Sequence, residues 1–393
     1  MKKHDYAQYC VGCGLCGAKC GQKMQKTDKG YLVHANEMPD KCVEFCDEYC
    51  PASQNSINKL NTSSVWGYYE KVHIGYSSDR EIRNNASSGG VLSALAIYLL
   101  DKGLIDAVIH TGKDEKLPYN TMTKISVTKQ DVMKNCGSRY AISHSLLDMW
   151  EFVEPGKKYC YIGKPCDVTA LKNFLEKNEM LSEQFPYIFS FFCAGMPSTQ
   201  ANLELLAKLN CKEECIDLTY RGNGWPGFAT AVDRNGNEHQ LDYVTAWGGI
   251  LGRDINRFCR FCLDGIGERA DISCGDAWYL LPDGNPDFTE HEGRNIVFTR
   301  NAKGNTLLQD AVRDGYIIIE PIDDVDNYLK QMQKYQFVRR STMSVKLLAC
   351  RMFGMNIPYS SKGVVKELAK HASISDKYKI FKGTIKRILT KKI

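Results

Sequence analysis

Residues 69–111, YEKVHIGYSSDREIRNNASSGGVLSALAIYLLDKGLIDAVIHT, have the pattern of a strand, a helix and a second strand. The first residues alternate between polar and apolar, as in a half-buried strand. The run that begins at Val91 is apolar on nearly all sides, which predicts a buried helix that Ser87 or Ser88 caps and Gly103 ends. Two strands joined by a helix are typical of parallel strands in one sheet.

The same order of elements occurs twice more along the chain. A strand, a helix and a strand are predicted at 158–163, 164–177 and 187–195, and residues 295–320 repeat the order. Residues 228–246 predict a β-hairpin, because Asn235-Gly236 separates two alternating stretches. We therefore expect an α/β fold with a mixed-sheet core.

The length and composition indicate a chain of two or three domains that works in the cytoplasm. The chain has 393 residues, which is long for one core. No apolar run is long enough for a membrane span, and the N-terminal lysines precede no apolar leader. The 17 cysteines are an odd number. Clustered cysteines in a reducing compartment usually bind metal or carry out redox chemistry.

The N-terminal sequence YCVGCGLCGAKCGQ has the spacing C-x2-C-x2-C-x3-C, formed by Cys10, Cys13, Cys16 and Cys20. This spacing is typical of a bacterial-type ferredoxin loop that holds a [4Fe–4S] cluster. A zinc site usually has two C-x2-C pairs set well apart, so zinc is the weaker alternative. The segment is poor in long apolar runs, and we expect it to need its cofactor for its shape.

A second run, KCVEFCDEYCPAS, follows with Cys42, Cys46 and Cys50. Cys50-Pro51 matches the end of the ferredoxin pattern, and the fourth ligand of such a cluster comes from the distant run. Cys10, Cys13, Cys16 and Cys50 are therefore predicted to hold one cluster. Cys20, Cys42 and Cys46 remain for a second cluster that lacks one ligand. The alternative is a structural loop in which Cys42 and Cys46 are free thiols.

Four more cysteines are candidate ligands in the body of the chain. Cys166 and Cys193 each follow an apolar strand, and the carboxyl ends of parallel strands meet at the ligand-binding edge of a sheet. Cys259 and Cys262 form a C-x2-C pair, which is weak as a signal by itself. The other body cysteines have the character of apolar core residues, namely Cys160, Cys211, Cys215 and Cys350. Cys274 is left unassigned.

Six motifs occur together in the order found in the coenzyme F420 hydrogenase/dehydrogenase beta-subunit family. They are SSGGVLSALAIYLLDKGLIDAVIHTG, GSRYAISHS, YIGKPCDVTALKNFL, FFCAGMPS, YRGNGWPG and CRFCLDGIGERADISCGDAW. The chain resembles this family from residue 1 to about 330. The resemblance implies a flavoprotein with FAD and [4Fe–4S] clusters, two or three in number. It also implies that Cys166, Cys193, Cys259 and Cys262 ligate a flavin-proximal cluster.

Members of this family differ in substrate. Archaeal members act on the deazaflavin coenzyme, plant and cyanobacterial relatives reduce chlorophyll-type molecules, and some bacterial members accompany enzymes of surface-polysaccharide synthesis. The resemblance therefore implies an oxidoreductase without naming its substrate. No Ser-His-Asp set, paired carboxylates or P-loop is evident, so we expect the cofactors to carry the chemistry and no side chain to act as a nucleophile.

Two polar loops are candidate flavin contacts. Ser87, Ser88, Gly89 and Gly90 precede the buried helix and offer hydroxyls and backbone N–H groups to the FAD phosphates. The alternative is a capped helix without a ligand. Three residues of the second loop are also predicted to contact the flavin or its ribityl chain, namely Gly137, Ser138 and Tyr140.

Two charged residues are weaker candidates for flavin contacts. Lys164, beside Cys166, could stabilise charge on the reduced ring, although a solvated lysine is the more common outcome. Asp276 could bind a flavin hydroxyl or only close a turn.

The C-terminal tail is basic and has the pattern of a helix. From Arg339 onward there are fourteen Lys and Arg against two Asp and Glu. Apolar residues recur at helical spacing among the lysines, namely Ile380, Phe381, Ile385, Ile388 and Leu389. The tail could bind an anionic membrane surface or an acidic partner, or it could be a solvated helix docked by one apolar stripe. The confinement of basic charge to the tail argues against nucleic acid.

We therefore predict three parts: a ferredoxin-type domain at 1–62, a flavin and iron–sulfur core at 63–335 and a basic helical extension at 336–393. The main hypothesis is an oxidoreductase that passes electrons from ferredoxin or another donor through [4Fe–4S] clusters and FAD to a small organic substrate, with a link to surface-polysaccharide synthesis. The alternative is an electron-transfer subunit whose partner enzyme holds the substrate site. A scaffold without turnover is a third hypothesis.

Overall fold

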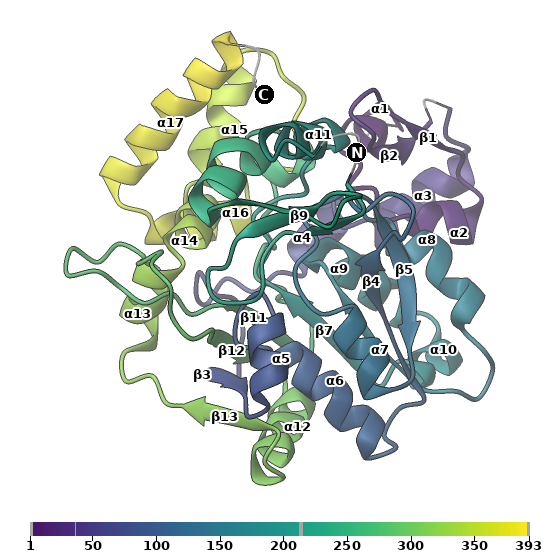
Figure 1. Cartoon of the computed structure of the whole chain (residues 1–393). Helices are drawn as coiled ribbons and strands as arrows, with labels where there is room; N and C mark the ends of the chain where they lie inside the picture. The colour runs from purple at the N-terminus through teal and green to yellow at the C-terminus, as the bar shows by residue number, and fades with distance from the viewer. Residues whose placement is uncertain (1–2, 36, 212–214, 391–393) are drawn as a thin grey trace.

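The computed structural model describes residues 3–35, 37–211 and 215–390 (Figure 1). Its largest element is a mixed eight-stranded sheet with the order β13-β3-β12-β11-β7-β6-β4-β5. The strands are β3 (Lys71–Ser77), β4 (Ala107–Lys113), β5 (Thr121–Ser126), β6 (Tyr159–Gly163), β7 (Tyr187–Phe191), β11 (Ile272–Asp276), β12 (Asn295–Thr299) and β13 (Ile317–Glu320). The prediction of a mixed-sheet α/β fold is confirmed.

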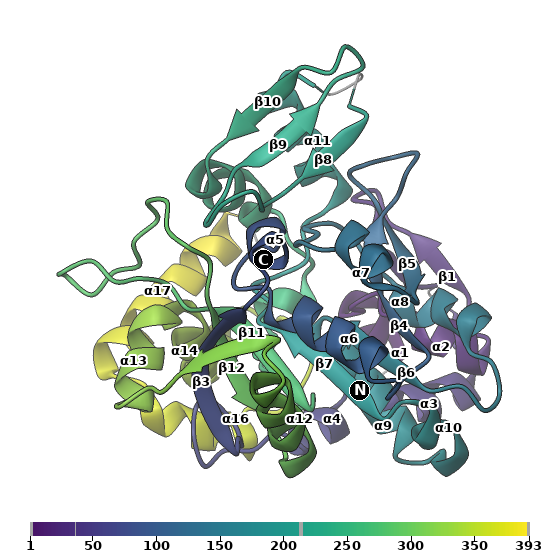
Figure 2. The same cartoon turned by 60° about the horizontal axis from the view of Figure 1, so that its bottom comes forward.

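Helices cover both faces of this sheet because side chains alternate along each strand. Val108, Cys160 and Phe189 point to the face that α6 (Val91–Asp101) and α12 (Ala302–Arg313) cover. Their neighbours Ile109 and Tyr161 point to the face that α9 (Pro165–Leu175) covers. Figure 2 shows α6 and α12 in front of the sheet. The remaining helices of this region are α5 (Arg80–Asn85), α7 (Lys129–Lys134), α8 (Ser145–Asp148) and α10 (Glu179–Gln184).

The predicted strand–helix–strand units are present, but in two of them the strands are not neighbours in the sheet. β6 and β7 are parallel neighbours joined through α9. β3 and β4 also run parallel, but β12, β11, β7 and β6 lie between them. β12 and β13 lie on opposite sides of β3. Sequence periodicity identifies the elements, and the order of strands depends on contacts between distant segments.

The cap predicted for the first long helix is wrong. Gly90, at φ 76°, is the N-cap of α6, rather than Ser87 or Ser88. The Asn295 side chain accepts a hydrogen bond from the N–H of Val91 at 3.2 Å, so a residue from β12 satisfies this first helical donor. The helix is buried nearly all round, as predicted, because it packs against the sheet and against the neighbouring helices α5, α7 and α12.

The N-terminal part packs against α8 and α9 (Figure 1). It consists of α1 (Lys3–Gln8), α2 (Leu15–Cys20), β1 (Met24–Lys26), β2 (Leu32–His34), α3 (Asp40–Tyr49) and α4 (Gln54–Asn58). Its own apolar cluster is small and is centred on Tyr6, Cys16, Met38, Cys42 and Cys46. Three of those five residues are cysteines, which fits the expectation that this segment needs a cofactor for stability.

A three-stranded sheet lies apart from the large sheet (Figure 2). It contains β8 (Asp217–Thr219), β9 (Ala229–Val232) and β10 (Glu238–Leu241), and it packs with α11 (Thr199–Lys208). β9 and β10 are antiparallel, and Gly236 has φ 82° in the turn between them. The predicted hairpin is confirmed.

The C-terminal residues are helical, as predicted, and α17 lies beside α15 (Figure 1). The helices are α13 (Val325–Met332), α14 (Lys334–Ser341), α15 (Met343–Met352), α16 (Val364–Leu368) and α17 (Ile374–Leu389). Met343 and Leu347 of α15 are part of the core beneath α9. Four residues of the predicted apolar stripe of α17 are half-buried and Leu389 is 68% exposed, as expected for a docked helix. No helix in the described residues is long and apolar enough to cross a bilayer.

Candidate metal centres

The four candidate cysteines of the body line one small cavity. Cys166 lies in the first turn of α9, directly after β6, and Cys193 follows β7. Cys259 lies within a short 3-10 turn at Phe258–Arg260, and Cys262 follows this turn. The parallel strands β6 and β7 end at the same edge of the sheet, so they bring Cys166 and Cys193 together as expected. This group of four thiols is called the body site below.

Burial makes the body-site thiols poor acids in the absence of metal. It raises the pKa of Cys259 to about 12 and that of Cys262 to about 11. The guanidinium of Arg339, which lines the same cavity, partly opposes this effect on both thiols. Arg339 donates to the carbonyl oxygen of Cys193 at 2.9 Å, as does Gln336 at 3.1 Å. Because metal ligands must be thiolates, metal binding here would release protons.

Five N-terminal thiols line a second small cavity. They are Cys10, Cys13, Cys16, Cys46 and Cys50. The four residues predicted to hold one cluster therefore lie around one space, and Cys46 joins them because it precedes Cys50 by one helical turn of α3. This cavity is called the N-terminal site below.

His34, which the sequence did not single out, also lines the N-terminal site. It ends β2 and is 2% exposed. Its Nε2 lies 2.8 Å from Cys16 Sγ, and a ring nitrogen lies with Cys16 Sγ and Cys46 Sγ in a group within 4.8 Å of one another. Burial lowers the pKa of His34 to about 4, so the imidazole is neutral. A lone histidine has no spacing signal, which is why sequence reasoning missed it.

Cys20 and Cys42 lie next to each other but are not among the described residues that line the N-terminal site. The Cys42 thiol donates to the carbonyl oxygen of Cys20 at 3.2 Å, and the Cys20 thiol donates to the carbonyl oxygen of Cys16 at 3.0 Å. Cys42 is one helical turn before Cys46 on α3, so both thiols lie on one face of that helix. The expected grouping of Cys20, Cys42 and Cys46 is thus compatible with the fold.

The two sites are adjacent. Val11 lines both cavities. The side-chain amide of Asn256 donates to the carbonyl oxygen of Cys10 at 3.1 Å, which ties the N-terminal loop to the loop that carries Cys259. The two groups of thiols therefore share a wall.

Lys164 lines the body site. Its ammonium donates to the Asp167 carboxylate at 2.7 Å and to the Ser143 carbonyl and hydroxyl at 3.0 and 2.9 Å. Burial alone would lower the pKa of Lys164, but the Asp167 carboxylate and the thiols of Cys166 and Cys13 raise it above its usual range. A charged ammonium is thus held beside thiols of both sites.

The predicted phosphate loop already makes several hydrogen bonds within the protein. The Ser87 hydroxyl accepts from the N–H of Ser138 at 2.6 Å and donates to the Arg221 carbonyl at 3.3 Å. The Ser88 hydroxyl donates to the Arg294 carbonyl at 2.7 Å. A side chain at Gly89 would collide with the backbone of β3 and β12, so packing explains this glycine. The loops that carry Ser87 and Ser138 are thus neighbours, as a shared flavin site would require. The hydroxyl groups of Ser87 and Ser88, however, form hydrogen bonds with the protein backbone.

Asp276 ends β11 at the same edge of the sheet as the body site. Arg221 pairs with Asp276 at 3.0 Å, and Trp225 Nε1 donates to the same carboxylate at 3.2 Å. The guanidinium nitrogen of Arg221 that donates to Asp276 also lies 3.4 Å from the Tyr140 hydroxyl. Sequence reasoning missed Arg221 because a single arginine in a glycine-rich loop gives no sign of its partners.

The remaining body cysteines are mostly core residues. Cys160 and Cys274 pack beneath α6, Cys350 packs in the core on the α9 face, and Cys211 packs under the three-stranded sheet. Cys274 is not among the described residues that line either cavity.

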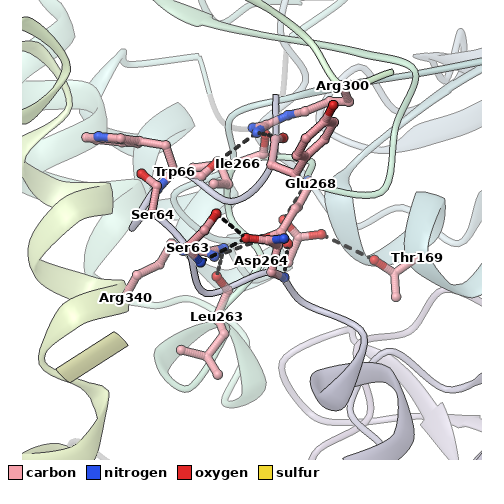
Figure 3. Close-up of polar contacts among 12 residues, drawn as sticks. Ser63, Ser64, Trp66, Thr169, Leu263, Asp264, Ile266, Glu268, Arg300 and Arg340 are labelled. Atoms are coloured by element: carbon pink, nitrogen blue, oxygen red, sulfur yellow. Dashed lines mark hydrogen bonds and ion pairs between the residues drawn. The ribbon is translucent and has the colours of Figure 1, made fainter. Parts of the chain in front are cut away.

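A buried polar network supports the loop that carries Cys262 (Figure 3). Arg340, which is fully buried, donates to the Leu263 carbonyl at 2.7 Å and pairs with Glu268 at 2.8 Å. Glu268 also accepts from the backbone N–H of Asn61. The network thus joins α14, the body-site loop and the segment that follows the N-terminal part.

Arg300 and Asp264 extend the network. Arg300 donates to the carbonyl oxygens of Trp66 and Ile266 at 2.7 and 2.9 Å (Figure 3). Asp264, which lines the body site, accepts from the Glu268 N–H at 2.9 Å and from the Thr169 hydroxyl at 3.2 Å. These contacts fix the backbone immediately after Cys262.

Glu268→Ala is expected to destabilise the fold by about 3–5 kcal/mol, because it leaves the Arg340 charge buried without a counter-charge. Urea unfolding followed by circular dichroism measures this loss. Glu292→Ala is the control, because Glu292 pairs with Arg83 but is 79% exposed, and such a pair contributes about 1 kcal/mol or less. Equal losses in the two variants would contradict the role given to the network.

Comparison with known proteins covers most of the chain. Residues 72–148 match the family model "Coenzyme F420 hydrogenase/dehydrogenase, beta subunit N-term", and residues 156–325 match the model for the C terminus of the same coenzyme F420 hydrogenase/dehydrogenase protein. The coenzyme F420 hydrogenase subunit beta of Methanothermobacter thermautotrophicus is 23% identical over 301 residues, which are 75% of this chain and 100% of the relative. The F420-dependent formate dehydrogenase 1 subunit beta of Methanococcus maripaludis is 27% identical over 63% of this chain and 60% of the relative.

A solved structure has the same fold. A chain of the F420-reducing [NiFe] hydrogenase complex from Methanosarcina barkeri aligns with a TM-score of 0.58 and 23% identity, over 76% of this chain and 98% of that chain.

Proposed function

Since the chain belongs to the coenzyme F420 hydrogenase/dehydrogenase beta-subunit family, we propose that it is an iron–sulfur electron-transfer subunit and that a partner enzyme completes the reaction. Electrons pass between the N-terminal site and the body site. The observation that carries this proposal is the shared wall of the two thiol-lined cavities, where Val11 contributes to both.

The donor atoms at both sites suit iron–sulfur clusters. Four thiols converge on the body site, and the four cysteines predicted to hold one cluster line the N-terminal site. Thiolates are the soft ligands that such clusters require. Lys164 and Arg339 supply positive charge in the wall of the body site, where a cluster with four thiolate ligands would carry a net negative charge.

FAD is the further cofactor of this proposal. Its chemistry would be exchange of electron pairs with a substrate and of single electrons with the clusters. The residues that fit it best are Gly137, Ser138, Tyr140 and Asp276, with the buried cation Arg221 among them. Gly137 adopts φ 96°, a conformation that favours glycine, and a Cβ at this position would lie at van der Waals distance from the Arg221 and Asn85 carbonyl oxygens.

Arg339→Met is expected to make the body cluster harder to reduce, because it removes a buried cation from the cavity wall. Two unit charges about 8 Å apart at an effective dielectric constant of about 20 interact by about 2 kcal/mol, or about 90 mV for one electron. A shift of this order is expected in an anaerobic redox titration. Arg339→Lys keeps the charge and should retain most of the potential, so equal shifts in both variants would contradict an electrostatic role.

The function itself is tested with the anaerobically purified chain and an artificial electron donor. We expect about eight or more irons, a similar amount of sulfide and about one FAD per chain, with clusters that accept electrons but turn over no small molecule until a partner subunit is added. Turnover of an organic substrate by the isolated chain would favour the stand-alone oxidoreductase. The link to surface-polysaccharide synthesis stays a prediction of that hypothesis.

A further inference from the structure

The N-terminal part holds more metal-binding groups than one cluster needs. If Cys10, Cys13, Cys16 and Cys50 hold the first cluster, Cys46 remains as a fifth thiol of the same cavity. Cys42 lies one turn before Cys46 on α3, and Cys42 contacts Cys20. Three thiols are thus grouped beside the first cluster, but a cubane cluster with all four irons held by the protein requires four ligands.

His34, which lines the N-terminal site, has a ring nitrogen without a hydrogen-bond partner among the described residues. Its Nδ1 is buried and has no hydrogen-bond partner among the described residues, although buried polar atoms are nearly always paired. Its other nitrogen, Nε2, lies 2.8 Å from Cys16 Sγ. If Nε2 carries the proton and donates to that sulfur, Nδ1 carries a free lone pair. A neutral imidazole with a free lone pair is a metal ligand.

The fold holds this imidazole firmly. The β1–β2 ribbon that ends at His34 joins Cys20 to the helix that carries Cys42 and Cys46. The Gln22 side chain donates to the carbonyl oxygens of Lys23 and Glu37, each at 3.1 Å, and so ties the two ends of the ribbon together. The histidine thus lies on the ribbon that joins Cys20 to the helix of Cys42 and Cys46, and its ring lies in one group with the thiols of Cys16 and Cys46.

We propose that His34 Nδ1 is the fourth ligand of a second N-terminal iron–sulfur cluster, whose other ligands are Cys20, Cys42 and Cys46. Nε2–H then donates to Cys16, a ligand of the first cluster, so one imidazole connects the two clusters. Replacing a thiolate by a neutral nitrogen removes one negative charge, and histidine ligation raises the potential of iron–sulfur clusters. The second cluster therefore has a higher potential than its all-thiolate form. This inference rests on the proposed iron–sulfur function.

The test compares the reconstituted full chain with His34→Ala and His34→Cys, using iron and sulfide content, pulsed EPR and redox titration. We expect about twelve irons in the wild type and in His34→Cys, and about eight in His34→Ala. The wild type should show the nitrogen coupling of a directly bound imidazole, and His34→Cys should lose this coupling and have a lower potential. The cysteine variant retains a ligand, so its result is independent of any folding defect in the alanine variant.

Three outcomes would separate this inference from the proposed function. About eight irons and no imidazole coupling in the wild type would overturn the histidine ligand and leave the two four-cysteine clusters standing. Unchanged iron content in His34→Ala would show that His34 only donates a hydrogen bond to Cys16 and would also overturn the inference. Failure of the wild type to bind iron at all would instead refute the proposed function.

Discussion

The Cys259→Ser variant is expected to lose the body cluster, and with it about four irons and a similar amount of sulfide per chain. Cys259 is one of four thiols that line the body site, and its loop is fixed on one side by Asn256 and on the other by Asp264. A serine hydroxyl is a hard and weakly acidic donor that does not replace a thiolate. Iron and sulfide analysis after anaerobic purification measures the loss.

Cys215→Ser is the matched control for this variant. Cys215 is half-buried and packs against the core under the three-stranded sheet, outside the residues that line the two cavities. Its iron content should equal that of the wild type. Full iron content in Cys259→Ser would refute the assignment of this cysteine as a ligand, whatever the control shows.

The second large effect is expected for Cys13→Ser. The N-terminal part has a small apolar cluster that consists mostly of cysteines, so cluster binding supplies much of its folding energy. We expect the variant to lose the first cluster and to become sensitive to proteolysis within residues 1–60. The body should remain folded, because two of its apolar clusters contain no residue of the N-terminal part, although Cys13 itself packs in the cluster beneath α9. Limited proteolysis with mass spectrometry measures this change.

Cys13→Ser should also block electron entry from a protein donor. The body cluster should still be reduced by dithionite, which is small, but reduced ferredoxin should no longer reach it at the wild-type rate. Stopped-flow absorption with both donors distinguishes the two routes. Rapid ferredoxin reduction of the body cluster in the variant would contradict a path through the N-terminal site.

Local signals in the sequence predicted the elements that hold the body site. The apolar runs at 158–163 and 187–195 contain strands β6 and β7, and Cys166 and Cys193 follow these strands. Neighbouring parallel strands end at one edge, so the convergence of these thiols follows from local patterns alone. The hairpin at Asn235-Gly236 was predictable for the same kind of reason, because its turn chemistry is local.

Features that depend on distant segments could not be predicted in this way. The cap of α6 is completed by Asn295, and the strands β3 and β4 are separated by four others. Arg221 and His34 take their places through partners 55 and 18 residues away. No spacing rule in the sequence predicts contacts between residues this far apart. The C-terminal helices were predicted from their composition, but the contact of Arg340 with Glu268 was not, because it depends on how α14 docks.

Electron transfer between adjacent iron–sulfur sites is tested most directly by EPR spectroscopy of the anaerobically reduced chain. Two reduced clusters on either side of Val11 should interact magnetically, so the wild-type spectrum should be broadened or split. The interaction with the body cluster should vanish in Cys259→Ser, while the N-terminal signal remains. Two results would contradict the account that clusters occupy the two adjacent sites. One is a wild-type spectrum that equals the sum of the spectra of independent clusters. The other is a spectrum that Cys259→Ser leaves unchanged.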